Sequence, residues 1–272
     1  MANTDRLFSN YIPKLYEAYM VPMLFEPYAE DLASRVASRN PQRVLEIAAG
    51  TGVVTRVLAS TLPRDTEILA TDLNQPMIDH AASIGTARTV EWRQADAMAL
   101  PFDDESFDAV VCQFGVMFFP DRAKAYAEVR RVLRPGGVFI FNTWDRIEEN
   151  DIANVITDAL AAVFPDDPPR FMARVPHGYF DVAVIERDLA NGGFTKKPEI
   201  VTVTMRSRAK TPEDAAIAIC QGTPVRNEIE TRDATRLEEA TNVSAEAIAK
   251  RFGRGEVDAK MQARVVTIAA GE

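Results

Sequence analysis

The sequence predicts an α/β fold built on a doubly wound, seven-stranded, mostly parallel sheet of Rossmann-like type with helical insertions. Between residues 43 and 144, short apolar runs alternate with amphipathic stretches, which is typical of parallel strands joined by crossover helices. The first run leads into the turn Ala49-Gly50-Thr51-Gly52, and a helical pattern follows at once. Two further apolar runs near the C-terminus complete the sheet.

The strands are taken from the apolar runs and the helices from the spacing of apolar residues between them. We expect the strands at 43–48, 67–72, 89–93, 107–114, 137–144, 199–205 and 258–269. Helix 53–62 places Val54, Val57 and Leu58 on one face. Helix 121–133 runs into Pro135-Gly136-Gly137, a triplet that we expect to stop the helix and turn the chain.

The remaining segments read as helices around this alternating core. Two helices are expected before it, on either side of Pro22, because proline interrupts a helix. An aromatic loop is expected between 165 and 180, as an insertion. The further expected helices are 10–20, 26–38, 149–164, 181–191, 211–222 and 233–252.

Composition and charge limit the classes of function. Hydrophobic residues make up 47% and charged residues 26% of the 272 residues, which is ordinary for a folded protein. The net charge of -9 argues against a nucleic-acid partner. Cys112 and Cys220 give neither a disulfide framework nor zinc-ligand spacing, so no metal is expected. Since no apolar run approaches the roughly 20 residues that cross a bilayer and no signal peptide is visible, we expect a cytoplasmic protein without membrane contact.

The glycine turn after the first strand is the first candidate binding feature. Glycine lacks a Cβ, so backbone at Gly50 and Gly52 can approach a ligand closely. By itself the turn fits a nucleotide phosphate site or an ordinary loop equally well. The third glycine of a dinucleotide fingerprint is replaced by Thr55, and no Walker lysine follows.

Two carboxylates follow the next strands. Asp72 stands 20 residues after Gly52, where it could accept hydrogen bonds from ribose hydroxyls, or could cap the helix that starts near Asn74. Asp96 follows the third strand, where it could accept from an adenine amine or be an ordinary turn aspartate. Adenosine binding is the functional interpretation of this pair.

Four motifs carry a family resemblance. VLEIAAGTG, TDLNQPMI, QADAMALPFDDESFDAVVCQFGVMFF and EVRRVLRPGGVFIF resemble, in this order, the motifs of class I S-adenosylmethionine-dependent methyltransferases, and most closely the type 11, ubiquinone/menaquinone-biosynthesis-like family. The resemblance covers 43–144 closely and 181–205 loosely. Ala48 departs from it, because this family often has its first glycine there.

The resemblance implies S-adenosylmethionine as the cofactor. It implies that the turn 46–52 holds the methionine part, Asp72 the ribose, Asp96 with Ala97 the adenine, and Gln113 with Phe114 the region near the sulfonium. The cofactor-binding residues that it implies are Glu46, Ala48, Gly50, Thr51, Gly52, Asp72, Leu73, Met77, Asp96, Ala97, Met98, Gln113 and Phe114.

Candidates for catalysis and acceptor binding come from the aromatic and histidine residues. Methyl transfer from a sulfonium mainly needs alignment and exclusion of water, so a general base is optional. His177 is a candidate base, with a solvated loop histidine as the alternative. Tyr16, from the stripe that includes Tyr11 and Tyr19, is a candidate lid residue, with plain packing as the alternative. Four apolar or aromatic residues are interpreted either as an acceptor pocket or as core packing: Met117, Phe118, Phe171 and Tyr179.

The sequence therefore predicts methyl transfer to a small, apolar or aromatic molecule by a single domain, 1–272, with a homodimer left open. The alternatives are an NAD(P)-dependent reductase, which lacks its Tyr-x-x-x-Lys pair here, and a non-catalytic S-adenosylmethionine-binding protein. The expected parts are an N-terminal helical lid (1–40), the cofactor-binding core (41–146), substrate-cap insertions (147–180 and 207–256) and the C-terminal part of the sheet (181–206 and 257–272).

Overall fold

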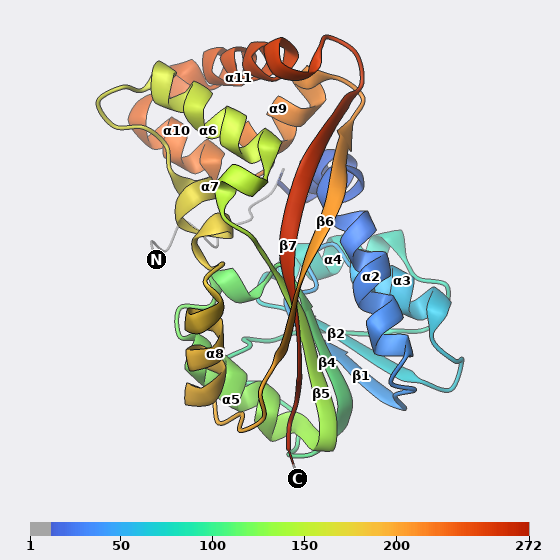
Figure 1. The fold of residues 1–272 in the computed structure, drawn as a ribbon. Coiled ribbons are helices and arrows are strands. Elements are labelled where there is room, and N and C mark those ends of the chain that lie inside the picture. The colour runs from blue at the N-terminus through green and yellow to red at the C-terminus, as the bar shows by residue number, and fades with distance from the viewer. Residues whose placement is uncertain (1–11, 272) are drawn as a thin grey trace. The chain divides into compact units, whose positions relative to one another are not determined.

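The computed structural model describes residues 12–271 and contains the expected seven-stranded sheet (Figure 1). Its strands are β1 (Arg43–Glu46), β2 (Glu67–Asp72), β3 (Glu91–Gln94), β4 (Phe107–Gln113), β5 (Leu133–Trp144), β6 (Glu199–Ala209) and β7 (Val257–Ala269). The strand order is β3-β2-β1-β4-β5-β7-β6, and β1 to β5 pair in parallel. The mostly parallel, doubly wound fold is confirmed.

Strand β7 is the antiparallel member next to β5. Ala270 N donates to Gly137 O at 2.8 Å, whereas Asp145 N donates to Gln262 O at 3.0 Å. The residue number rises along β5 as it falls along β7, so the two strands run in opposite directions. The carboxyl ends of the parallel strands therefore define one edge of the sheet, the edge where open α/β sheets bind ligands.

Helices connect these strands and flank them. They are α1 (Ile12–Leu15), η2 (Tyr16–Phe25), α2 (Glu26–Ala37), α3 (Val53–Thr61), α4 (Gln75–Ile84), η3 (Val116–Phe118), α5 (Arg122–Val132), η4 (Ile147–Glu149), α6 (Asp151–Val163), α7 (Phe171–Arg174), η5 (Pro176–Gly178), α8 (Val182–Asn191), α9 (Pro212–Cys220), α10 (Val225–Asp233), η6 (Ala234–Arg236) and α11 (Leu237–Phe252). In Figure 1, α2 and α3 lie on one side of the parallel strands, while α5 and α8 lie together on the other.

Burial explains why the central strands are continuous apolar runs. In β4, Ala109, Val110, Val111 and Cys112 are all fully buried, because helices cover both faces of a parallel sheet. Helix α3 buries Val54 and Leu58 completely, at the spacing that the sequence indicated. These contacts hold the glycine turn between β1 and α3 on a rigid base.

The junction of α5 and β5 differs from the expectation. Helix α5 ends at Val132, and the strand begins at Leu133, so the Pro-Gly-Gly triplet lies inside β5. Phe107 pairs with Leu133 but Ala109 pairs with Val138, which leaves the triplet as an irregularity opposite a short piece of β4. The expected strand start at 137 was wrong, because the strand begins at Leu133, before Pro135 and Gly136.

The N-terminal helices also differ from the expectation, because Pro22 does not separate them. Pro22 lies inside the π-helix η2, which passes into α2 through Glu26 with helical dihedral angles of -55° and -48°. Proline interrupts the i→i−4 hydrogen bonds of an α-helix, and here the chain around Pro22 follows the wider i→i−5 spacing of a π-helix. Tyr11, from the expected tyrosine stripe, lies outside the described residues.

Other boundaries differ by a few residues, and several short elements were missed. Strand β3 starts at Glu91 rather than 89, and β6 extends to Ala209. The aromatic loop contains α7 and η5, and α10 precedes the last long helix. Helices of three or four residues leave no periodic pattern in a sequence, and α10 has a largely polar composition with only Val225 and Ile229 buried.

The chain divides into two compact units, and each is described by itself. One contains residues 1–27, 144–178 and 203–263, of which the structure describes those from 12 on. In it, α11 packs against α6 and α9, and α9 packs against η2. The other contains 28–143, 179–202 and 264–272, and holds β1 to β4 with the glycine turn. Strands β6 and β7 contribute residues to both units.

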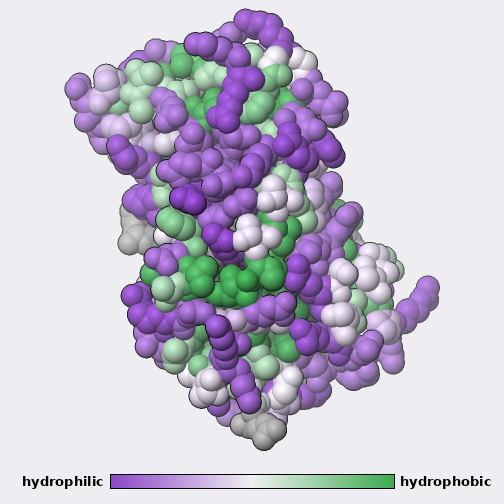
Figure 2. All heavy atoms as spheres, in the orientation of Figure 1, coloured by the Kyte–Doolittle hydropathy of each residue, from purple (hydrophilic) through white to green (hydrophobic). Residues whose placement is uncertain are grey.

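The side chains of β7 alternate between a buried face and a more exposed face. Val257, Ala259, Met261 and Ala263 are buried, and the residues between them are more exposed. Figure 2 shows both hydrophilic residues and a band of hydrophobic residues on the face seen in Figure 1. Within residues 12–271, no helix combines the length and apolar character that a membrane crossing requires.

Candidate functional site

The turn after β1 has an unusual backbone. Ala48, Gly50 and Gly52 have φ of +54°, +57° and +82°, so three residues in five lie in the left-handed region. Alanine pays an energetic cost there that glycine does not, and such strain in a fold is concentrated at functional sites. Phe114, directly after β4, has φ +50° and lies at the same edge of the sheet. The strained residues thus mark the carboxyl ends of β1 and β4.

The two glycines of the turn have different reasons to be glycine. A Cβ on Gly52 would lie 2.6 Å from Cη2 of Trp92, so this position is closed by packing on β3. A Cβ on Gly50 would meet nothing within 4 Å. Open space beside a left-handed glycine leaves room for a ligand against the backbone, and Gly50 is therefore the position where close approach is available.

Asp72 holds the turn from the end of β2. Its Oδ2 accepts from Gly50 N at 2.9 Å, and its Oδ1 accepts from Asn74 N at 2.8 Å and Asn74 Nδ2 at 3.2 Å. Burial raises the pKa of Asp72, and the hydrogen bonds from Asn74 and Gly50 oppose that rise. The N-cap residue of α4 is Asn74, so Asp72 holds the turn that precedes the helix rather than capping the helix itself. A ribose contact stays a prediction, for which the remaining lone pairs are available.

Glu46 is a buried carboxyl group at the end of β1. Its side chain is enclosed, and Thr55 Oγ1 on α3 donates to its Oε2 at 2.5 Å. Desolvation raises the pKa of Glu46 to about 8, although the Thr55 hydrogen bond and the charge of Arg56 lower it. Thr55, which replaces the third glycine of a dinucleotide fingerprint, thus has a definite task as the partner of Glu46.

Asp96 and its neighbours form the loop after β3. Met98 N donates to Asp96 Oδ1 at 2.9 Å, which is the geometry of an aspartate turn, and Ala97 is largely buried. Leu73 is 41% exposed, an unusual exposure for a leucine beside buried Asp72, whereas Met77 is buried. The exposed apolar side chain of Leu73 beside this loop offers a surface on which a flat ring could pack. The assignment of the adenine to this loop stays a prediction.

Buried polar atoms at this edge include some that have no hydrogen-bond partner within residues 12–271. Thr51 Oγ1 and Asn142 Nδ2 have no hydrogen-bond partner among the residues that the structure describes. Thr51 is 1% exposed and Asn142 is fully buried, so water does not replace the missing partner. A buried polar group that stays unsatisfied costs about 1–3 kcal/mol. Such groups at a ligand-binding edge indicate partners that a ligand supplies.

Asn142 was missed by the sequence interpretation. It lies on β5 in register with Gln113 of β4, and its Oδ1 accepts from Phe114 N at 2.8 Å. That bond fixes which end of the amide is oxygen and holds the left-handed backbone at Phe114. An asparagine within an apolar strand was the available signal, because a polar residue is rarely buried without a reason.

The predicted acceptor-pocket residues are mostly buried among other side chains. Met117 and Phe171 are fully or almost fully enclosed, and Phe118 is half-buried. Tyr179 Oη lies 3.2 Å from Tyr126 Oη on α5, and the Arg122 guanidinium lies 4.0 Å from the centre of its ring. The packing interpretation accounts for these contacts. The acceptor contacts stay predictions.

His177 is buried rather than solvated. Its Nδ1 lies 2.8 Å from the backbone oxygen of Asp145, so Nδ1 carries the proton and Nε2 keeps its lone pair. Burial lowers the pKa of His177 to about 4, against smaller opposing effects of Asp145 and Glu148. A neutral imidazole with one defined tautomer can accept a hydrogen bond at Nε2. The solvated-loop alternative was therefore wrong, and a catalytic role stays a prediction.

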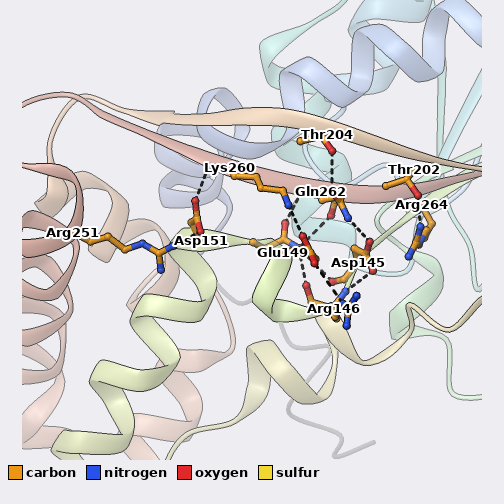
Figure 3. A network of polar contacts seen from close by, with 11 residues as sticks. Asp145, Arg146, Glu149, Asp151, Thr202, Thr204, Arg251, Lys260, Gln262 and Arg264 are labelled. Atoms are coloured by element: carbon orange, nitrogen blue, oxygen red, sulfur yellow. Dashed lines mark hydrogen bonds and ion pairs between the residues drawn. The ribbon is translucent and has the colours of Figure 1, made fainter.

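Asp145 is itself held by a polar network (Figure 3). Gln262 Nε2 on β7 donates to Asp145 Oδ2 at 2.7 Å, and Thr204 Oγ1 on β6 donates to Gln262 Oε1 at 2.9 Å. Lys260 forms an ion pair with Glu149. These contacts fix the carbonyl that orients His177.

Tyr16 belongs to an aromatic row in the same unit as His177. The rings of Tyr16 and Phe25 stack at 5.0 Å, Phe25 lies 6.3 Å from Trp144, and Trp144 lies 5.9 Å from His177. Both candidates for catalysis are therefore connected through two aromatic residues. This arrangement is also what core packing would produce, so it leaves the role of Tyr16 a prediction.

Comparisons with known proteins match the segment of the chain that contains this edge of the sheet. Residues 45–141 match a family model described as a methyltransferase domain. The demethylmenaquinone methyltransferase of Thermus thermophilus is 43% identical over 111 residues, which are 40% of this chain and 49% of that protein. The ubiquinone/menaquinone biosynthesis C-methyltransferase UbiE of Marinomonas sp. is 34% identical over 116 residues, 41% of this chain and 46% of that one.

Solved structures show the same fold over a longer stretch. Phosphoethanolamine N-methyltransferase 2 of Haemonchus contortus, determined with S-adenosyl-L-methionine, has a TM-score of 0.61 at 17% identity and covers all of this chain and 61% of that one. The YcgJ protein of Bacillus subtilis has a TM-score of 0.58 at 19% identity, over 90% of this chain and 99% of that one. At these identities the likeness is one of fold.

Residues 45–141 thus match a methyltransferase domain, and this segment is similar to demethylmenaquinone and UbiE methyltransferases. This domain coincides with the segment that holds the glycine turn, Asp72, Asp96 and the end of β4. The chain spans about half the length of the curated relatives that it matches.

Proposed function

We propose that the whole chain is an S-adenosylmethionine-dependent methyltransferase whose acceptor is a small, apolar or aromatic molecule. The observation that carries the proposal is the left-handed turn at Gly50, which has open space beside it and is held by Asp72 at the carboxyl edge of the sheet. The family match over this segment, and a structural neighbour that binds S-adenosyl-L-methionine, support the cofactor.

The residues present fit this cofactor. Gly50 leaves room against the backbone, and Thr51 Oγ1 is a buried polar group that lacks a partner within residues 12–271. We assign the methionine part to the turn 46–52, the ribose to Asp72, the adenine to the loop at Asp96 and the sulfonium region to the end of β4. The bound cofactor supplies an activated methyl group, and the chain aligns it and excludes water.

The comparisons give no support to the reductase or to the non-catalytic binding protein. Thr55 strengthens the case against a reductase, because it serves Glu46 where a dinucleotide site would have glycine or alanine. The cytoplasmic location, a homodimer, the absence of nucleic-acid binding and the substrate-cap role of the insertions belong to the same proposal and await their own tests.

Calorimetric titration with S-adenosylhomocysteine tests the cofactor assignment. The wild-type chain should bind it, and Gly50→Val should bind at least about tenfold more weakly, because the new side chain fills the space beside the turn. Gly85→Val is the matched control: Gly85 also has positive φ, at +82°, and open space beside its Cβ, but it ends α4 outside the turn.

Two results would contradict the proposal. One is a wild-type chain that does not bind S-adenosylhomocysteine. The other is an equal loss of affinity in Gly50→Val and Gly85→Val, since that pattern would reflect backbone strain alone. Formation of S-adenosylhomocysteine from S-adenosylmethionine with a panel of hydroxylated aromatic acceptors then tests turnover.

A further inference from the structure

The oxygen of the Asn142 side-chain amide has a hydrogen-bond partner, whereas its nitrogen has none within residues 12–271. Its Oδ1 accepts from Phe114 N at 2.8 Å, while its Nδ2 finds no hydrogen-bond partner among residues 12–271. The residue is fully buried near the end of β5, so neither donor reaches water. A leucine of similar volume would avoid the cost of enclosing an unpaired amide.

The strand order shows which ligand could supply the missing acceptor atom. The proposed cofactor contacts follow β3, β2, β1 and β4, which are four neighbouring strands of the sheet. The sulfonium region lies at β4, at one end of this row. The next strand is β5, which places Asn142 beyond the reacting end of the cofactor, where a methyl acceptor has to lie.

We infer that Asn142 is a specificity-determining residue whose Nδ2 donates a hydrogen bond to an oxygen atom of the methyl acceptor. The inference rests on the proposed function and adds to it a residue that contacts the acceptor. The amide stays neutral over the whole working pH range, so it recognises a phenolic or carbonyl oxygen without requiring a charge.

Phenol and toluene form a matched pair of probes, because a hydroxyl replaces a methyl group of similar size. We expect phenol to bind to the wild-type complex with S-adenosylhomocysteine about 5- to 100-fold more tightly than toluene, as one hydrogen bond to a buried donor implies. In a ¹⁵N-labelled chain, the side-chain amide signals of Asn142 should shift with phenol and stay in place with toluene.

Asn142→Asp separates the two halves of the side chain. It keeps an oxygen for Phe114 N and removes the Nδ2 donors, so the preference for phenol should disappear while S-adenosylhomocysteine still binds. The variant also identifies the Asn142 amide signals by their loss. The signal shift is measured on the wild-type chain, so it decides the question even if the variant fails to fold.

Each outcome bears on one proposal. If S-adenosylhomocysteine does not bind the wild-type chain, the proposed function fails. If it binds but phenol does not bind, or phenol leaves the Asn142 amide signals in place, the inference on Asn142 is overturned and the methyltransferase assignment stands. An unchanged ratio of phenol to toluene affinity in Asn142→Asp overturns the inference in the same way.

Discussion

The methyl group of Ala48 occupies the space that a side chain at Gly115 would need. A Cβ on Gly115 would lie 2.6 Å from Ala48 Cβ and 2.7 Å from Cys112 Sγ, both closer than real carbon contacts. Ala48 is the one departure of the turn from the family pattern, which often has glycine there. Glycine at 115 therefore leaves room for the Ala48 methyl group, and the ends of β1 and β4 are tightly packed.

This relationship predicts the effect of enlarging Gly115. Gly115→Ala should lower the free energy of unfolding by about 1–3 kcal/mol, because overpacking forces the strand ends apart. Urea denaturation measures the change. The double variant Ala48→Gly/Gly115→Ala should recover part of the loss, because it removes the methyl group that the new side chain meets.

Gly255→Ala is the control for the chemical change itself. A Cβ on Gly255 meets nothing within 4 Å, so this variant should leave the free energy of unfolding nearly unchanged. A loss at Gly255 equal to that at Gly115, or a double variant no more stable than Gly115→Ala, would contradict the packing account.

The buried carboxyl group of Glu46 predicts a stability that falls as the pH rises. Burial raises its pKa from 4.5 to about 8 in the folded chain, so below 4.5 both states hold the proton and the full stability is present. Between 4.5 and 8 only the unfolded chain ionises, and the free energy of unfolding should fall by up to about 1.4 kcal/mol per pH unit. Urea denaturation at several pH values measures this slope.

Glu46→Gln isolates that contribution, because glutamine does not titrate and can still accept from Thr55 Oγ1. The difference between wild type and variant should decline steadily from pH 5 to pH 8. A difference that is constant over this range would show that Glu46 is already ionised in the folded chain.

The sheet and the turn were predictable because local pattern determines them. Buried parallel strands are continuous apolar runs, and glycine favours the left-handed backbone that Gly50 and Gly52 adopt. The helical path through Pro22 was not predictable, because the π-helix that accommodates it leaves no sequence signal. The start of β5 was missed for a related reason, since Pro135 and Gly136 normally end an element.

The burial of His177 predicts a contribution to stability that is lost as the pH falls, which is opposite in sign to the effect expected for Glu46. Its pKa is lowered from 6.5 to about 4 by burial, so its contribution to stability is complete above 6.5 and is lost as the pH falls towards 4. NMR of a ¹⁵N-histidine-labelled chain should show a neutral ring with the proton on Nδ1 at pH 6. A ring that is half protonated at pH 6 would contradict the burial of His177 and its bond to Asp145.

Removing one of the two buried hydroxyls of Tyr126 and Tyr179 distinguishes a role in packing from a role in cofactor binding. Tyr126→Phe should lower the free energy of unfolding by about 1 kcal/mol, because it deprives Tyr179 Oη of a partner at 3.2 Å. S-adenosylhomocysteine affinity should stay unchanged. Calorimetry and urea denaturation of the same variant measure both quantities, and a loss of cofactor affinity without a loss of stability would assign this pair to the site instead.

The sequence could name the candidate residues but not their partners. Tyr179 was singled out as aromatic, yet its burial against Tyr126 depends on α8 packing on α5, which only the tertiary structure shows. Asn142 is the opposite case, a residue that the sequence interpretation did not name. It belongs to none of the motifs, and its importance becomes visible only when Phe114 N and an unpaired amide are found together.

The enclosure of Glu46 also has a consequence for calorimetry. At pH 7 the folded chain retains a proton on this carboxyl group, so its charge is one unit less negative than the formal -9. Unfolding exposes the group and releases that proton to the buffer. The heat of unfolding should therefore differ between Tris and phosphate by the difference in their ionisation enthalpies, and Glu46→Gln should make the two buffers agree more closely.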